Sequence, residues 1–578
     1  MKSTIKYMMY IVVLILAGSC ENYLEEEPRS LLTAKYLESA SGVEAALNSS
    51  YSDLRYFYGG EGALTVTCTG TDEWQKGPDG NANANLYQSG MAENGLIGNT
   101  WNWGYTAINT TNAVIKFADG AGLTEAKATQ FVAEAKYIRA TWYFIILQTY
   151  GPCPLNLDFI SEPSTEAHKA TAAEVYQAII DDLEEAKNNL VPVAEEPGRA
   201  DAAAAYHLLS KVYLARATHE TAKQGTDYQE AYNNAMYLID NSSTYGLALL
   251  QDFAEIHAPR NEHNSEVIFT VERNSDLLYN DAGTVNGNKN NRSSFFFRPH
   301  YQVCTDYGGL ARTIEYGRPW IRVRPTNYLL DVAFAERDDD TRYNKTFQTV
   351  WLVNDEASLT NPNFKLGDTA IWLPGTENYG SVGNVMNIYT PSMYYDNLLP
   401  DGTRQTIKIY PSMNKYDDID RPAVNDPSVR PFIVHRFSET YLVAAEAAMY
   451  LNMPDESREL LNVIRARAAN DADRSAGANA TAIQRITNAT PAMDNIDEGI
   501  SFILDERSRE LCGEYMRWWD LVRTRTAGGE VQLLHRIRTL DPEIPCRSTI
   551  EDYHILRPIP QTQIDLTSND DFLQNDGY

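Results

Sequence analysis

The sequence predicts a mostly α-helical protein, in which a scaffold of tetratricopeptide-like helical hairpins carries a loop-rich irregular region with a few short strands. Two blocks, 33–242 and 436–578, place apolar residues at helical spacing, with small residues and tyrosine at packing positions. Between them, 243–435 is rich in Asn, Gly, Asp and aromatic residues, and helical periodicity fades. We expect 33–578 to form one body, because the last block is too short and too apolar to fold alone.

The N-terminus has the features of a secretion signal. Two lysines precede an apolar run, 7–17, that is shorter than the roughly 20 residues a membrane-spanning helix needs. In bacteria, a cysteine after small residues at the end of such a signal is cut before and lipidated. We therefore predict a signal peptide at 1–19, lipidation of Cys20 and an acidic tether at 20–32. An ordinary cleaved signal with an incidental cysteine is the alternative.

Helix limits in the first block follow from capping residues. Thr124 precedes a strong helical pattern that Gly151 ends. Thr171 is followed three residues later by Glu174, which is a capping box. These signals predict successive helices within 33–242.

The middle and last regions give weaker signals. "EVIFTVERN" at 266–274 predicts a short strand, and one helix is expected near "PTNYLLDVAFAE" at 325–336. A helix pair is predicted over 438–470, with Asp455 as a cap, and a further helix or pair over 497–525. The tail, 555–578, is predicted to be extended.

Charge and cysteine content exclude several classes of protein. The net charge of −29 argues against binding to nucleic acid and against the body lying flat on an anionic membrane. After Cys20 the cysteine count is odd and no CxxC pair occurs, so a disulfide framework or zinc site is not expected. We predict buried free thiols at Cys68, Cys153, Cys304, Cys512 and Cys546.

The most enzyme-like feature is a row of carboxylates. Glu506, Glu510 and Glu514 are four residues apart and share one helix face, at a spacing that a glycosidase could use. Arginines interleave with them, so we predict an ion-paired face and no catalytic residues. The histidines, among them His207, lack metal-ligand spacing, and no GxSxG or P-loop motif is present. No metal or cofactor is expected.

Four stretches together resemble the SusD/RagB family of Bacteroidetes outer-membrane lipoproteins. They are Cys20 with "ENYLEEEP", "AEAKYIRATWYFIILQTYGPCPL" at 133–155, "HRFSETYLVAAEAAMYLN" with "ELLNVIRARA" at 435–468, and "ILDERSRELCGEYMRWWDLVRT" with the closing "PIPQTQIDL…QNDGY". Their order and spacing match across nearly the whole chain. Two local departures from the family pattern occur. The leucine of the lipidation signal, Leu16, lies one place further from Cys20 than usual, and Cys153 falls within the Tyr-Gly-Pro-Leu stretch.

The resemblance implies a SusD-like helical scaffold with four tetratricopeptide-like units, anchored by lipid on the surface of the outer membrane. It implies a lid on a TonB-dependent transporter of the SusC type, which catches an oligosaccharide and passes it on without bond chemistry. Two alternatives are a secreted glycoside hydrolase, with the carboxylates above as acid and base, and a helical-repeat scaffold that binds only protein.

The sugar-contacting residues are expected among loop aromatics, because stacking on a sugar needs an exposed flat ring. "EYGRPWIRVRP" is the strongest candidate, since Trp320 lies between two arginines whose planar groups suit hydroxyl or carboxylate oxygens. Alternatively, Trp320 packs inward and its arginines pair with acids such as Asp331 or Asp339. The full set of candidate glycan-binding residues is Trp74, Trp101, Tyr301, Tyr316, Arg318, Trp320, Arg322, Trp372 and Tyr395.

Overall fold

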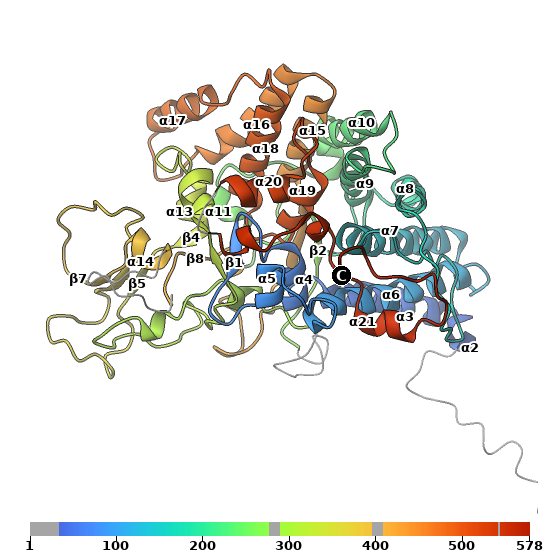
Figure 1. The fold of residues 1–578 in the computed structure, drawn as a ribbon, viewed down its shortest axis with the longest axis horizontal. Coiled ribbons are helices and arrows are strands. Elements are labelled where there is room, and N and C mark those ends of the chain that lie inside the picture. The colour runs from blue at the N-terminus through green and yellow to red at the C-terminus, as the bar shows by residue number, and fades with distance from the viewer. Residues whose placement is uncertain (1–33, 277–288, 396–407, 541–543) are drawn as a thin grey trace, which may run out of the picture.

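The computed structural model describes residues 34–276, 289–395, 408–540 and 544–578. The predicted signal peptide (1–19), the lipidation site Cys20 and the tether (20–32) lie outside the described residues. Helices dominate the described chain, and short strands gather in its middle region (Figure 1). The predicted fold class is therefore confirmed.

The first helical block begins and ends its helices where capping chemistry indicates. The side chain of Thr124 accepts a hydrogen bond at the start of α7, and Gly151 ends that helix with φ of 75°. Thr171 and Glu174 form the predicted reciprocal capping box at the start of α8. The helices of this block are α2 (Ala34–Leu37), α3 (Ala40–Asp53), α4 (Glu61–Thr67), α5 (Ala82–Leu86), α6 (Gly95–Phe117), α7 (Glu125–Tyr150), α8 (Ala172–Asn189), α9 (Ala202–Ala217) and α10 (Asp227–Asp240).

The second helical block contains the predicted helix pair, with two corrections. The tail at 555–578 is not extended throughout, because Gln561–Leu566 forms the short helix α21. Asp455 does not cap α16; the helix begins one residue earlier at Pro454, whose missing N–H costs nothing in the first turn. The helices here are α15 (Phe437–Tyr450), α16 (Pro454–Ala468), α17 (Ala476–Asn488), α18 (Ile496–Leu511), α19 (Arg517–Arg523), α20 (Gln532–Thr539) and α21 (Gln561–Leu566).

The two helical blocks join into one array. Helices α6 to α10 pack each against the next, and α10 then packs against α15, which also contacts α16 and α18. Figure 1 shows α9 and α10 beside α15 and α16, although nearly 200 residues separate α10 from α15 along the chain. The middle region is thus an insertion between two neighbouring helices of a continuous scaffold.

The middle region forms small sheets and short helices. The predicted strand near 266–274 is β2 (Val267–Val271), and it pairs antiparallel with β9 (Phe432–Arg436) at the base of the insertion. The helix expected near 325–336 is instead a π-helical turn at Tyr328–Ala333. Other strands are β1 (Trp74–Lys76) paired with β3 (Val323–Pro325), β4 (Phe347–Gln348) with β8 (Ser412–Met413), and β5 (Val350–Leu352), β6 (Thr369–Trp372) and β7 (Val385–Ile388) in one sheet. The short helices are α11 (Phe253–Ile256), α12 (Ser293–Phe296), α13 (Arg342–Thr346) and α14 (Pro391–Tyr395).

The cysteines after Cys20 behave as predicted. Each of the five is buried and free of a disulfide. Burial raises the pKa of the Cys68 thiol to about 12, and the Cys153 and Cys304 thiols rise similarly. These thiols stay protonated at neutral pH and act as small apolar side chains.

Across the described ranges, we find no helix that combines the length and the apolar character needed to cross a membrane.

Candidate functional site

Three of the predicted sugar-contacting rings lie in the interior. Trp74 and Tyr301 are 0% exposed and Trp101 is 1% exposed. Trp74 pairs across β1 and β3 with Pro325, and its ring packs against Phe297 at 4.8 Å between centroids. A ring without an exposed face cannot stack on a sugar, so the expectation of exposed rings is wrong for these three residues.

Trp101 was expected among the loop aromatics, but it lies within a helix. Asn94 caps α6, and the helix begins at Gly95. Trp101 therefore projects from the second turn into the helical core, where it packs against Tyr150 at 5.3 Å.

Tyr316 is also buried, so the expectation of an exposed ring is wrong for it as well, and its hydroxyl is in use. The hydroxyl accepts a hydrogen bond from the backbone N–H of Leu352 (2.8 Å), and the ring meets Tyr301 edge to face at 5.7 Å. Burial raises the pKa of Tyr316. The residue fixes the 313–322 segment to β5, and its role is to position that segment.

Trp320 remains partly exposed, as expected. Its backbone N–H donates to the carbonyl of Phe295 (3.1 Å), and its ring packs against Phe295 (5.3 Å) and Phe296 (5.9 Å) of α12. Next to it, Ile321 has φ of 43°, a conformation that costs a β-branched residue on the order of 1–3 kcal/mol. The aromatic residues of α12 thus hold Trp320 at the surface through an unusual turn.

Three arginines surround the Trp320 ring. The guanidinium carbons of Arg322, Arg318 and Arg292 lie 4.9, 5.2 and 5.4 Å from its centroid, within the range of cation–π attraction. The alternative pairing with Asp331 or Asp339 does not occur, because those acids pair with Arg337 and Arg485. Arg322 instead pairs with Glu61 (2.6 Å).

The sequence predicted part of this surface and missed the rest. Arg318, Trp320 and Arg322 occupy alternate positions of one short stretch, so they were found together. Arg292, Phe295 and Arg421 come from distant parts of the chain; the ring of Phe295 lies 5.6 Å from the guanidinium of Arg421. The only local signal in the sequence for these three residues was the run of phenylalanines at 295–297, just before "RPH" at 298–300.

Trp372 and Tyr395 are each partly exposed. Trp372 ends β6 and meets Tyr379 edge to face at 5.7 Å, while Tyr395 meets Tyr394 at 4.7 Å. Burial and the neighbouring Tyr394 and Asp331 raise the pKa of Tyr395, so its hydroxyl stays protonated. These rings retain the exposure that stacking requires.

The carboxylate row of α18 is a buried ion-pair network. Glu506 pairs with Arg509 (2.7 Å) and Arg342 (2.8 Å), and Glu510 pairs with Arg342 (2.9 Å) and Arg436 (2.9 Å). Burial alone would raise the pKa of both carboxyls, but the arginines hold it well below its usual range. The predicted ion pairing is confirmed, although most partners come from other elements than α18.

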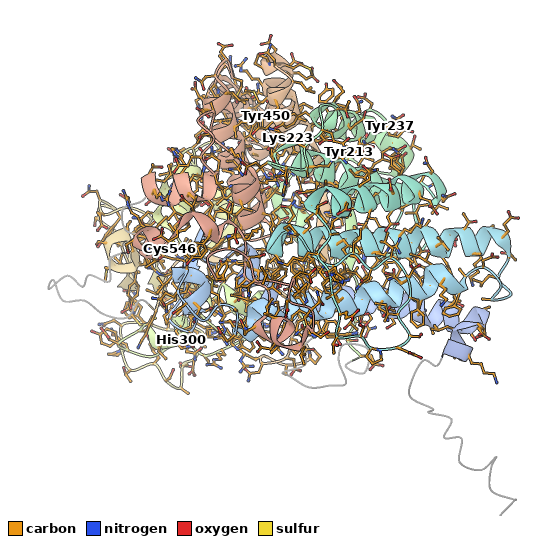
Figure 2. All side chains as sticks on the ribbon, turned by 45° about the vertical axis from the view of Figure 1, so that its right-hand side comes forward. Tyr213, Lys223, Tyr237, His300, Tyr450 and Cys546 are labelled. Carbon is orange, nitrogen blue, oxygen red and sulfur yellow. The ribbon has the colours of Figure 1, made fainter. Side chains whose placement is uncertain are left out.

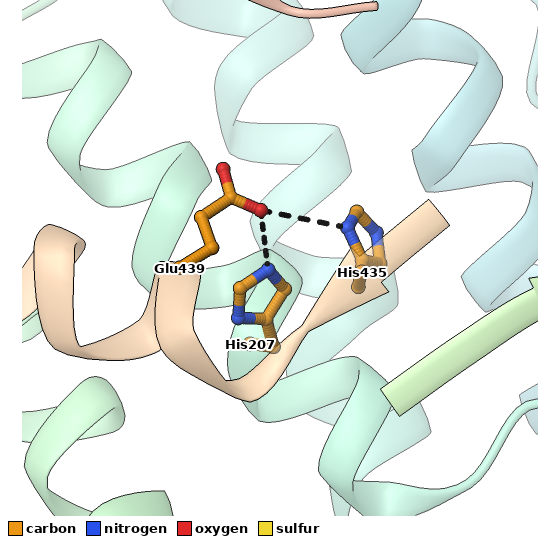
Figure 3. A group of neighbouring side chains, drawn as sticks. All are labelled: His207, His435 and Glu439. Atoms are coloured by element: carbon orange, nitrogen blue, oxygen red, sulfur yellow. Dashed lines mark hydrogen bonds and ion pairs between the residues drawn. The ribbon is translucent and has the colours of Figure 1, made fainter. Parts of the chain in front are cut away.

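The fold brings together one cluster of metal-ligand types that sequence spacing did not reveal (Figure 3). His207 Nε2 lies 3.1 Å and His435 Nδ1 4.0 Å from the same Glu439 oxygen, in the interior. Lys211 (2.9 Å) and Arg507 (3.2 Å) also bind Glu439. A divalent cation would have to enter beside two positive side chains, so the chemistry of this cluster fits an ion-pair network better than a metal centre.

A cavity in the second helical block lacks the features of a sugar site. It measures about 330 Å³ and is lined by polar residues such as Asp497, Ser501 and Arg536. No Trp, Tyr or Phe lines it, so it offers no stacking surface. The candidate surface is instead the open loop face around Trp320.

Comparison with known families agrees with the fold. The model of the SusD family matches residues 265–578, more than half of the chain, and a model described as starch-binding associating with outer membrane matches 22–214. The chain belongs to the SusD family.

Individual relatives extend over most or part of the chain. SusD-like protein P25 of Formosa agariphila is 25% identical over 99% of both chains, and SusD-like protein P2 of the same organism is 26% identical over 98% of both. The starch-binding protein SusD of Bacteroides thetaiotaomicron is 27% identical over 28% of this chain and 29% of its own.

Solved structures share the fold at low identity. A SusD homologue from Bacteroides thetaiotaomicron has a TM-score of 0.67 and 19% identity, covering 94% of this chain and 98% of its own. A laminarin-binding SusD-like protein has a TM-score of 0.60 and 21% identity, and the match covers 93% of this chain and 100% of that protein's chain.

Proposed function

We propose that this protein is a cell-surface glycan-binding lipoprotein that captures oligosaccharides and delivers them to a SusC-like TonB-dependent transporter. The observation that carries the proposal is the match of nearly the whole chain to SusD-like proteins. A relative that matches 28% of this chain is described as starch-binding, and one structural neighbour as laminarin-binding. The partly exposed aromatic and arginine side chains of the loop face support it, because such groups bind sugar hydroxyls and ring faces.

The protein performs no bond chemistry in this proposal. A glycosidase needs one carboxyl with a raised pKa as its acid, and the carboxyls of Glu506 and Glu510 have the opposite shift. Both side chains are also fully buried, out of reach of a polysaccharide. These properties favour binding over hydrolysis.

The first helical block and the middle region would bind different partners. We propose that the first helical block, 33–242, meets the transporter and that the loops of 243–435 meet the sugar. The continuous packing of α6 to α10 gives a rigid surface for a protein partner, and the middle region supplies the exposed rings.

Affinity gels loaded with a panel of polysaccharides, together with co-purification from membranes, test this function. We expect at least one glycan to retard the protein, and a barrel transporter to co-purify even when Trp320 is replaced by alanine. Retardation by no glycan while a transporter co-purifies would favour the protein-binding scaffold. Sugar release that disappears in Glu506→Gln and Glu510→Gln would establish the hydrolase instead.

Cys20→Ala is expected to abolish membrane anchoring. Without the thiol no acyl chain can be attached, so the variant should leave the membrane fraction or be held only by an uncleaved signal. Fractionation followed by mass spectrometry of the mature N-terminus measures both outcomes. Cys304→Ala, which changes a buried thiol, should stay anchored. A Cys20→Ala protein that is processed normally and still anchored would contradict the prediction.

A further inference from the structure

Basic side chains gather around Trp320 although the chain as a whole is strongly acidic. We name Arg292, Arg312, Arg318 and Arg322 the Trp320 arginine cluster; three of them flank the ring, and Arg312 is close enough to lower the pKa of Arg318. The cluster continues toward His300, whose pKa is lowered mainly by burial and also by Arg312 and Lys408, against an opposing effect of Asp79. Figure 2 places His300 on the loop-rich side, far from Tyr237 and Lys223 of the helical scaffold.

Two members of this cluster have no carboxylate partner among the residues that the structure describes. Arg318 makes one hydrogen bond, to the carbonyl of Asn425 at 3.4 Å, and Arg312 makes one, to Gln302 Oε1 at 2.9 Å. Burial lowers the pKa of Arg318, and the positive charges of Arg312 and Arg322 lower it further. Arg318 is thus a partly buried cation next to like charges.

This arrangement differs from that of the best-paired arginines in the interior. Arg342, Arg436 and Arg517 each contact two or more carboxylates at 3.3 Å or less. With 78 acidic against 49 basic residues, this chain has ample carboxylates to neutralise a surface arginine. An uncompensated cation is therefore a local cost that a negatively charged ligand would offset.

A buried donor beside the cluster gives a second, independent observation. Arg421 is 3% exposed, and within the described chain its Nη1 has no hydrogen-bond partner. Its guanidinium lies over Phe295 at 5.6 Å, and Arg318 lies over the same ring at 5.8 Å. Burial lowers the pKa of Arg421, Asp418 and Asp426 offset this effect only in part, and one of its donors remains unused.

We propose that the Trp320 arginine cluster binds the anionic group of an acidic saccharide, a uronate carboxylate or a sulfate ester, with Arg318 as its main contact. This inference rests on the proposed glycan-binding function and names the class of glycan. The guanidinium fork matches both oxyanions with paired hydrogen bonds. The Trp320 ring, flanked by three guanidinium groups, orients them for the ligand and is not a free stacking platform.

Calorimetry with size-matched oligosaccharides tests the inference. The probes are an oligogalacturonate, a sulfated galactan oligosaccharide and a neutral laminarin oligosaccharide, each at low and at physiological salt. We expect one acidic probe to bind more tightly than the neutral one, and Arg318→Gln and Arg312→Gln to weaken it about tenfold or more. Arg318→Lys should recover part of the affinity, because it keeps the charge and loses the fork. The control is Arg485→Gln, an exposed arginine of α17.

The outcomes separate this inference from the function beneath it. If only the neutral oligosaccharide binds, or if Arg485→Gln weakens the acidic probe as much as Arg318→Gln does, the arginine cluster is not the site and glycan binding stands. If none of these probes and no glycan of the affinity-gel panel binds, the proposed function fails with it. Preference for the uronate or for the sulfated probe assigns the anion.

Discussion

Replacing Glu510 by alanine is expected to lower the free energy of unfolding by about 3–5 kcal/mol. The carboxylate contacts Arg342, Arg436 and Arg467, all of them buried. Its removal leaves positive charge in a low-dielectric interior with fewer partners, and that desolvation cost exceeds the strength of any single surface ion pair. Denaturant unfolding at pH 7, followed by circular dichroism, measures the change.

The pH dependence of the same variant has a defined sign. The folded-state pKa of Glu510 lies below its usual value near 4.5, because Arg467, Arg436 and Arg342 overcome the effect of burial. Its stabilising contribution is therefore complete above about pH 5 and is lost as the pH falls through the folded pKa. The difference in the free energy of unfolding between the wild type and Glu510→Ala should become smaller below pH 4.

A matched control comes from the same helix. Glu498 is exposed in the first turn of α18, and Glu498→Ala should cost under about 1 kcal/mol. A Glu510→Ala protein that is as stable as Glu498→Ala would mean that the network contributes little and that its charges reach solvent.

Trp74→Ala is expected to lower the free energy of unfolding by about 3–5 kcal/mol as well, through a cavity in the core. The ring is 0% exposed and packs between Phe297 and Phe347. In a glycan-binding assay this variant would lose activity because it unfolds, and a binding measurement alone would misassign Trp74 to the sugar site. Thermal unfolding, measured beside binding, separates the two effects.

Trp372→Ala is the comparison for Trp74→Ala. Trp372 is partly exposed at the end of β6, so its removal should change stability by about 1 kcal/mol or less. If Trp74→Ala kept the wild-type melting temperature and lost only glycan affinity, the ring would have to be accessible in solution, against the packing described here.

Local chemistry explains what the sequence could predict. Caps such as Thr124 and the Thr171–Glu174 box depend on neighbours within one turn, and these were found in the structure. The ion pairing of α18 was also predictable, since its arginines interleave with its glutamates. The identity of most partners was not, because Arg342, Arg436 and Arg465 come from other elements.

Exposure of a loop aromatic depends on contacts that are distant in sequence. Trp74 and Trp320 both follow polar loops and look alike locally. Trp74 is covered because β1 pairs with β3 and brings the ring under α12, whereas Trp320 lies on the outer side of the same short helix. No periodicity within either segment distinguishes them.

The antiparallel pairing of β2 with β9 has a consequence for how this scaffold can diverge. Because Val267 lies opposite Arg436 and Val271 opposite Phe432, the chain leaves and re-enters the helical array at one point. Because the ends of the segment between β2 and β9 are already held together, doubling its length adds only about 0.6 kcal/mol to the free-energy cost of closing the loop. Provided that the segments anchoring β1, such as β3, are kept, the region between β2 and β9 can be exchanged by grafting while the helical array stays unchanged.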